Sequence, residues 1–185
     1  MKLLLAALAG IVLLGPAAQA ESKLIAEAVG DINGDGVKDR AQLVLANDDG
    51  DVDLAIYVSA GRKLPARPTL VKHAFGWSGD NAGQIPDIKF NARGSILVGF
   101  GNDAAGRDRW HSQYTIAWRN GALVVAGYSH TERDTLNPDA GGGCDIDFLT
   151  GKGQRNLKPV TVPAHAVALA DWSDKSIPKA CKFDD

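Results

Sequence analysis

The sequence predicts a mostly β fold: a single antiparallel β domain, shaped as a sandwich or an open barrel-like sheet, with few short helices. Two observations lead to this prediction. Helical periodicity is scarce, and short runs rich in β-branched and aromatic residues alternate with Gly, Pro, Asn and Asp along the chain. The 185 residues are 45% apolar and 23% charged, an ordinary globular composition, and no low-complexity linker divides them.

Eight segments have the composition of strands. In order along the chain they are residues 24–29, 40–46, 52–59, 85–91, 95–100, 110–119, 122–129 and 144–149. The Asn120-Gly121 pair lies between two of them, and both residue types tolerate positive φ, so we expect a type I′ hairpin there. Residues 47–51, rich in Asn and Asp, likewise predict a turn.

Prolines indicate the structure of two further segments. Residues 62–83 contain Pro65, Pro68 and several glycines, and we expect them to be irregular or briefly helical. Pro159 and Pro163 flank one more short apolar strand. The prediction is therefore a sheet-forming chain with one long irregular connection.

The first twenty residues have the order of a secretory signal peptide. Lys2 supplies a positive charge, residues 3–14 form an apolar run, and small residues at 18–20 precede a cleavage site. We expect cleavage after Ala20, which leaves a single mature domain, residues 21–185, in the periplasm or outside the cell. The apolar run is shorter than the ~20 residues that a membrane-spanning helix needs, which argues against a membrane anchor. No later segment is long and apolar enough to span a bilayer, so we expect no stable membrane insertion after cleavage.

The two cysteines are expected to pair. Cys144 and Cys181 both lie in the mature chain, and an even number of cysteines in an oxidising compartment favours a disulfide. A cysteine nucleophile working with a histidine is the alternative, and nothing in the spacing supports it. The disulfide would tie the C-terminal segment to the glycine-rich residues 141–143.

The charge balance argues against general nucleic-acid binding. The chain has 20 Lys and Arg against 22 Asp and Glu, a formal net charge of −2. Nucleic-acid binding depends on a basic surface that displaces counterions from the phosphates. We therefore expect the partner to be a protein or a glycan.

One motif, D-x-N-x-D-G-x-x-D at residues 31–39, predicts a calcium site. Calcium takes about six to eight oxygen ligands, and a tightly curled loop can turn alternate residues inward. Gly36, at the sixth position, permits the sharp turn that such a loop needs. The predicted ligands are Asp31, Asn33, Asp35, the carbonyl group of Val37, and Asp39. The alternative is a surface turn without a metal, because Asp, Asn and Gly also suit ordinary turns.

The residues around this motif distinguish it from an EF-hand. An EF-hand carries Glu at the twelfth position, where this chain has Gln42, and residues 40–45 alternate as a strand rather than opening a helix. A loop of this kind between two strands resembles the FG-GAP and VCBS repeats of integrin-like and bacterial extracellular proteins. The resemblance covers residues 24–44 and implies a calcium-stabilised β-hairpin, with the five predicted ligands at the ligand positions of the family. Those families repeat the hairpin around a propeller, whereas this chain has one copy.

The C-terminal half carries a second resemblance. The runs at residues 114–119, 123–128 and 147–152 are similar to those of small uncharacterised bacterial exported proteins, which also contain a D-x-N-G-D-G loop. This resemblance implies a single exported domain and brings no activity with it.

Several other features look functional, and each has an ordinary structural explanation. Residues 99–104 match G-x-G-x-x-A, but no helix is expected to follow, so we predict a hairpin loop. Asp145 and Asp147 share one face of a strand and could bind a cation or pair with Arg155. Trp110 and Trp118 could form a carbohydrate platform, but rings on one strand face also suit a core.

These observations favour an exported, non-enzymatic β domain with one structural Ca²⁺ site that acts as a protein- or glycan-interaction module. One alternative is a periplasmic inhibitor or immunity protein against a cell-wall enzyme or toxin, which would insert residues 72–84 or 103–109 into a cleft. The other is a hydrolase whose catalytic residues meet only in the fold. A deep cleft that gathers His111, His130 and several carboxylates would favour the hydrolase. No motif identifies a catalytic residue.

Overall fold

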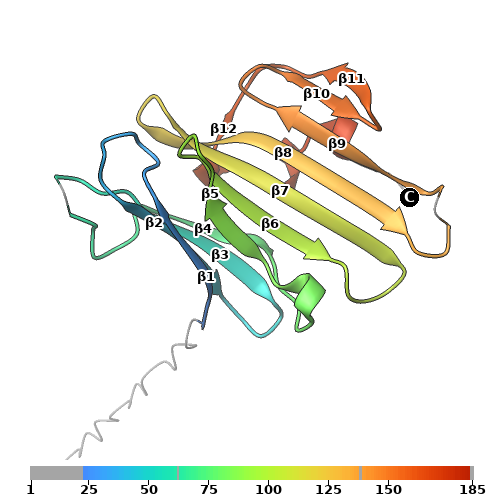
Figure 1. Ribbon diagram of the computed structural model, residues 1–185, viewed down its shortest axis with the longest axis horizontal. Coiled ribbons are helices and arrows are strands. Elements are labelled where there is room, and N and C mark those ends of the chain that lie inside the picture. Colours follow the sequence, from blue (N-terminus) through green and yellow to red (C-terminus); the bar gives the residue numbers. More distant parts are fainter. Residues whose placement is uncertain (1–22, 62, 138, 184–185) are drawn as a thin grey trace, which may run out of the picture.

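The protein consists of two antiparallel β-sheets, which confirms the predicted β fold and its sandwich form (Figure 1). The structure is a computed structural model that describes residues 23–61, 63–137 and 139–183. The predicted signal peptide lies outside the described residues. No helix in the described part of the chain has the length and apolar character needed to cross a membrane.

The first sheet is a meander of four strands. They are β1 (Lys23–Gly30), β2 (Asp39–Leu45), β3 (Asp51–Tyr57) and β4 (Leu70–Trp77), in the order β1-β2-β3-β4. The D-x-N-x-D-G loop joins β1 to β2, and the predicted turn at residues 47–51 joins β2 to β3. The hairpin implied by the family resemblance is therefore present as the first two strands of this sheet.

The expectation that residues 62–83 are irregular or briefly helical was wrong for Leu70–Trp77, which form β4, whereas a short 3₁₀ turn does begin at Ala82. The strand pairs with β3 although its register shifts between Val52 and Leu54. Asp53 holds this bulge in place: its carboxylate contacts His73 Nδ1 at 2.7 Å and accepts a hydrogen bond from the Ala74 N–H at 2.9 Å. Ala74 has a φ of 46°. A long-range partner thus produces a strand where local sequence favours none.

The second sheet is a longer meander. Its strands are β5 (Asp87–Phe90), β6 (Ile96–Asn102), β7 (Asp108–Arg119), β8 (Ala122–Asp134), β9 (Gly141–Asp147), β10 (Lys152–Arg155) and β11 (Lys158–Thr161), and β12 (Val167–Ala168) also pairs with β8. Asn120 and Gly121 have φ of 52° and 80°, which confirms the predicted turn between β7 and β8. Four 3₁₀ turns complete the chain: η1 (Ala82–Gln84), η2 (Leu169–Asp171), η3 (Asp174–Ser176) and η4 (Lys179–Cys181).

The core lies between the two sheets. The largest fully buried side chains include Leu43, Leu54 and Ile56 of the first sheet and Ile96, Ile116 and Ile146 of the second. Phe75 of β4 packs against Phe100 of β6 and Tyr114 of β7, with ring centroids 5.9 and 4.8 Å apart. Figure 1 shows the first sheet on the β5–β6 side of the second. Burial of these inner faces is the main source of stability.

The C-terminal segment is fastened to the second sheet by the predicted disulfide. Cys144 of β9 is bonded to Cys181 of η4, which confirms the pairing. Leu169 and Trp172 are buried in the main core. Arg155 donates hydrogen bonds to the backbone carbonyls of Lys179 and Ala180. The segment is therefore part of the folded domain.

We expect Cys144→Ser to lower the melting temperature of the oxidised protein and to change it little under reducing conditions. The disulfide closes a loop with a sequence separation of 37 residues, and the chain-entropy estimate for such a loop is about 4 kcal/mol. Thermal unfolding with and without a thiol reductant measures the effect. Equal losses under both conditions would show that side-chain packing, rather than the cross-link, carries the contribution.

Candidate functional site

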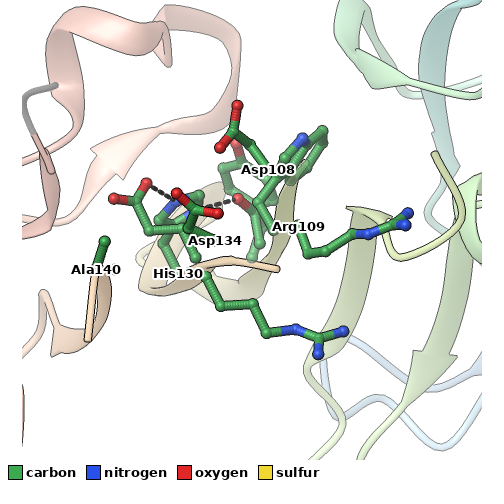
Figure 2. Close-up of a pocket in the computed structure, with 11 residues that line it drawn as sticks. Asp108, Arg109, His130, Asp134 and Ala140 are labelled. Carbon is green, nitrogen blue, oxygen red and sulfur yellow. Dashed lines mark hydrogen bonds and ion pairs between the residues drawn. The ribbon is translucent and has the colours of Figure 1, made fainter. Parts of the chain in front are cut away.

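A pocket of about 650 Å³ opens on the inner face of the second sheet, at the far end of the β7–β8 hairpin (Figure 2). A volume of this size is typical of ligand sites. The lining residues come from β7, β8 and the start of β9, and they are Asp108, Arg109, Trp110, Ser112, Tyr114, His130, Glu132, Arg133, Asp134, Ala140 and Gly141.

The pocket exists because the two sheets differ in length. Strands β7 and β8 have 12 and 13 residues, whereas those of the first sheet have seven or eight. Side chains alternate between the faces of a strand, so Trp110, Ser112 and Tyr114 all point inward from β7. His130 and Glu132 point the same way from β8. These residues occupy the part of the inner face that extends beyond the main contact between the sheets.

A chain of polar contacts runs across the floor of the pocket. Ser112 Oγ lies 2.8 Å from His130 Nδ1, and His130 Nε2 lies 3.4 Å from Glu132 Oε2; both contacts of His130 are drawn in Figure 2. Ser112 is buried, and its Oγ also lies 3.3 Å from the hydroxyl group of Tyr128. A hydroxyl, an imidazole and a carboxylate in this order can pass a proton along one line.

Burial of two tyrosines keeps their hydroxyl groups protonated. Tyr114 and Tyr128 are both buried, and desolvation of the phenolate is the main cause that raises the pKa of each. Both hydroxyl groups remain hydrogen-bond donors at neutral pH. Tyr128 is thereby able to donate toward Ser112.

Two ion pairs fix the outer rim of the pocket. Arg107 donates from Nε to both oxygens of Asp134, at 2.7 Å each, and Arg133 donates to Asp103 at 2.8 Å. Figure 2 shows the Arg109 side chain pointing away from His130 and Asp134. Among the described residues, neither Asp108 nor Glu132 forms an ion pair with a Lys or Arg. The two carboxylates are left to accept hydrogen bonds from a ligand.

The predicted aromatic platform is only partly assembled. Trp110 lines the pocket, with its ring 6.5 Å from that of His130 and tilted by 24°. Trp118 packs against the main core. The pocket therefore has one indole ring, rather than two, beside the carboxylates of Asp108 and Glu132.

The loop at residues 31–39 is curled by its own side chains. Asp31 Oδ1 accepts a hydrogen bond from the Gly34 N–H at 2.7 Å, and Asp31 Oδ2 accepts one from the Gly36 N–H at 2.8 Å. The bond from Gly36 is the main cause that lowers the pKa of the Asp31 carboxyl. Gly34 and Gly36 have φ of 77° and 80°, which glycine adopts without strain. Asp35 Oδ1 accepts from the Val37 N–H at 2.7 Å, and Asn33 Oδ1 accepts from the Asp35 N–H at 3.1 Å.

Asp39 differs from the other predicted ligands because it is completely buried. Its Oδ2 accepts a hydrogen bond from the Ile32 N–H at 2.7 Å. Its Oδ1 accepts two, from the backbone N–H and the hydroxyl of Ser59, each at 2.7 Å. The side chain thus ties the loop to the segment that follows β3. Among the described residues, no group of three or more His, Cys, Asp or Glu side chains is arranged to hold a metal ion.

The other residues that the sequence suggested as site members do not come together in the structure. His111 is exposed and alternates with Trp110 and Ser112, so it lies on the opposite face of β7 from His130. Arg155 does not pair with Asp145 or Asp147.

The structure also shows where the segments that were predicted to be loops lie. Residues 99–102 end β6, and those that follow form the loop to β7, as the hairpin prediction requires. Of the two segments considered as inserting loops, residues 72–77 belong to β4, and Asp103 of the other is tied to Arg133.

Ser112 and Glu132 were missed as members of a site by sequence reasoning. For Ser112 the local signal is alternation along the strand. The serine lies between Trp110 and Tyr114 on the inward face, where an apolar residue is expected. Only the pairing of Ser112 with His130 across β7 and β8 makes the serine a partner of the imidazole.

A family scan and searches of curated proteins and of solved structures each find no match to this chain.

We expect Asp134 to titrate with a pKa of about 2, because the hydrogen bonds from Arg107 stabilise its ionised form. The ion pair stabilises the fold fully above the ordinary carboxyl pKa of 3.8, and its contribution is lost as the pH falls through about 2. Arg107→Gln should raise the pKa of Asp134 toward 3.8. Carboxyl-carbon NMR titration measures this shift. Arg67→Gln, which removes an exposed charge elsewhere, should leave the titration unchanged, and the same shift in both variants would contradict the assignment.

Proposed function

We propose that this chain is an exported, non-enzymatic binding module that takes a segment of a glycan in the pocket on the inner face of β7 and β8. The observation that carries the proposal is the position of Trp110 beside Asp108 and Glu132 in a pocket of about 650 Å³. A sugar ring presents an apolar C–H face, which packs on an indole, and a periphery of hydroxyl groups, which donate to carboxylates.

The polar groups of the pocket support a ligand rich in hydroxyl groups. Glu132 and Asp108 accept hydrogen bonds and Tyr114 donates one, whereas both ring nitrogens of His130 are already in contact with Ser112 and Glu132. Donors and acceptors are therefore mixed along one wall. A ligand with adjacent hydroxyl groups, each of which donates and accepts, matches such a wall better than an apolar ligand does.

We also propose that Ca²⁺ stabilises the loop at residues 31–39. Asp31, Asn33 and Asp35 are brought onto one short curl, and the Val37 carbonyl follows it. Asp39 Oδ2 accepts one hydrogen bond from the chain and keeps a second lone pair. A bound ion would neutralise the repulsion among the carboxylates and order the link between β1 and β2.

We expect a Ca²⁺-specific and saturable rise in melting temperature. An extracellular site of this kind binds with a Kd of about 10⁻⁴ to 10⁻³ M, so 10 mM Ca²⁺ should stabilise the fold by about 1 to 3 kcal/mol, or about 3 to 10 °C. Thermal unfolding of residues 21–185 in EDTA, Mg²⁺ and Ca²⁺ measures this. Asp35→Ala should abolish the rise, and Asp48→Ala, an exposed aspartate outside the loop, should retain it. An unchanged response in Asp35→Ala would refute the ligand assignment.

We expect the protein to bind oligosaccharides and Trp110→Ala to weaken that binding by about tenfold, because the indole supplies the stacking surface. An array of neutral and anionic oligosaccharides identifies the ligand, and calorimetry with the best of them measures the Kd. Trp77→Ala removes an indole that lies outside the pocket and is the matched control. Absence of binding on the array, or equal losses in the two variants, would refute the glycan proposal.

Hydrolysis is the second candidate function, and the contact between Ser112 Oγ and His130 Nδ1 at 2.8 Å favours it. A serine activated by a histidine that contacts a carboxylate is an arrangement used for acyl transfer. It ranks second because Ser112 is buried, and its strand pairs with neighbours on both sides, which engages backbone N–H groups needed for an oxyanion hole. Recovery of the array ligand intact supports binding. Cleavage of an ester probe, p-nitrophenyl acetate, that is lost in Ser112→Ala would establish the hydrolase instead.

A further inference from the structure

A second hollow lies on the outer face of the second sheet. It measures about 290 Å³ and crosses β7, β8 and β9, where Thr115, Gly127 and Asp147 are register partners in one row. Thr115 follows the inward-facing Tyr114, so the hollow and the glycan pocket lie on opposite faces of the same strands. We refer to this hollow as the outer groove.

We propose that the outer groove binds a short zwitterionic peptide. The peptide carboxylate would lie against Arg93 and Arg119, and the peptide ammonium group would lie against Asp145 and Asp147. The site does not depend on the proposed glycan binding, because it uses the other face of the sheet.

The opposite charges of the groove are separated and do not pair with one another, although Asp147 Oδ1 accepts hydrogen bonds from the Leu149 and Thr150 N–H groups and Arg119 donates one to the Trp118 carbonyl. Arg93 lies in the turn before β6 and Arg119 at the end of β7, whereas Asp145 and Asp147 lie on β9. Two strand spacings, about 10 Å, separate β7 from β9. In the described part of the chain, none of the four forms an ion pair.

The groove is a hollow in the face of the sheet because the side chains at its base are small. Gly127 has no side chain, and Ala117 and Ala126 have only methyl groups. The register between β7 and β8 shifts between Thr115 and Ile116, which makes Ala126 an extra residue in β8. Glycine inside a strand often marks a place where a ligand or another backbone approaches closely. Here the glycine lies on β8 directly between Thr115 of β7 and Asp147 of β9.

This distribution of charge selects for a dipolar ligand. A carboxylate forms charge-assisted hydrogen bonds with guanidinium groups, and an ammonium group donates them to carboxylates. A simple anion or cation would be attracted to one end of the groove and repelled by the other. Gln113 and Ser129 lie in one row with Asp145, and both can form hydrogen bonds with a peptide amide. A few peptide units span the separation, because an extended chain advances about 3.4 Å per residue.

The test is calorimetric titration of the mature protein with trialanine, N-acetyl-trialanine and trialanine amide. We expect saturable 1:1 binding of trialanine and a loss of about tenfold or more in affinity when either terminus is capped. The double variant Asp145→Asn/Asp147→Asn should lose its preference for the free amino group but keep that for the free carboxylate. The double variant Arg93→Gln/Arg119→Gln should do the reverse.

Two controls separate this site from its surroundings. Arg67→Gln and Asp48→Asn make the same charge changes on exposed residues elsewhere and should leave trialanine binding unchanged. Trp110→Ala should also leave it unchanged, so failure of the glycan proposal would not affect this result. Binding that is insensitive to capping, no binding at millimolar peptide, or equal losses in the control variants would overturn the proposal.

Discussion

The packing of the two sheets against each other is the constraint on which the rest of the structure depends. Leu43, Leu54 and Ile56 of the first sheet are buried against Ile96, Ile116 and Ile146 of the second. Once these residues face inward, the period of two along a strand fixes the direction of every neighbouring side chain. The same constraint puts the pocket lined by Trp110 and the outer groove on opposite faces of β7 and β8. A slip of one residue in either strand would exchange their linings.

The unequal lengths of the sheets convert this packing into a site. The inner face of β7 and β8 continues past the first sheet, and the C-terminal segment packs on part of the remainder through Trp172, which lies 5.9 Å from Tyr114 between ring centroids. Phe183 lies 5.9 Å from the ring of His130. The disulfide between Cys144 and Cys181 holds this segment close to the sheet. His130 is thus bordered by a cross-linked element on one side and by the pocket on the other.

Asp39 gives the metal-binding proposal a structural context. As the first residue of β2, it joins Ile32 in the loop to Ser59 beyond β3, and Ser59 lies 20 residues further along the chain than Asp39. Any ion that orders the loop therefore acts on a residue already bonded to the rest of the first sheet. Stabilisation by calcium would reach three strands through this one carboxylate, whereas a surface turn without such a contact would stabilise only itself.

The sequence by itself determined the features that depend on near neighbours. Alternation located most strands, Asn120-Gly121 specified its turn through positive φ, and the spacing of Asp and Gly residues marked the loop at 31–39. The signal-peptide pattern and an even cysteine count were enough to predict the disulfide. Only the tertiary structure decided which distant residues meet: β4 exists because β3 offers it a partner, Ser112 meets His130 through strand register, and Asp39 finds Ser59. The physical reason is that composition and period report local conformation, whereas a site joins residues whose contact is set by how whole sheets pair and pack.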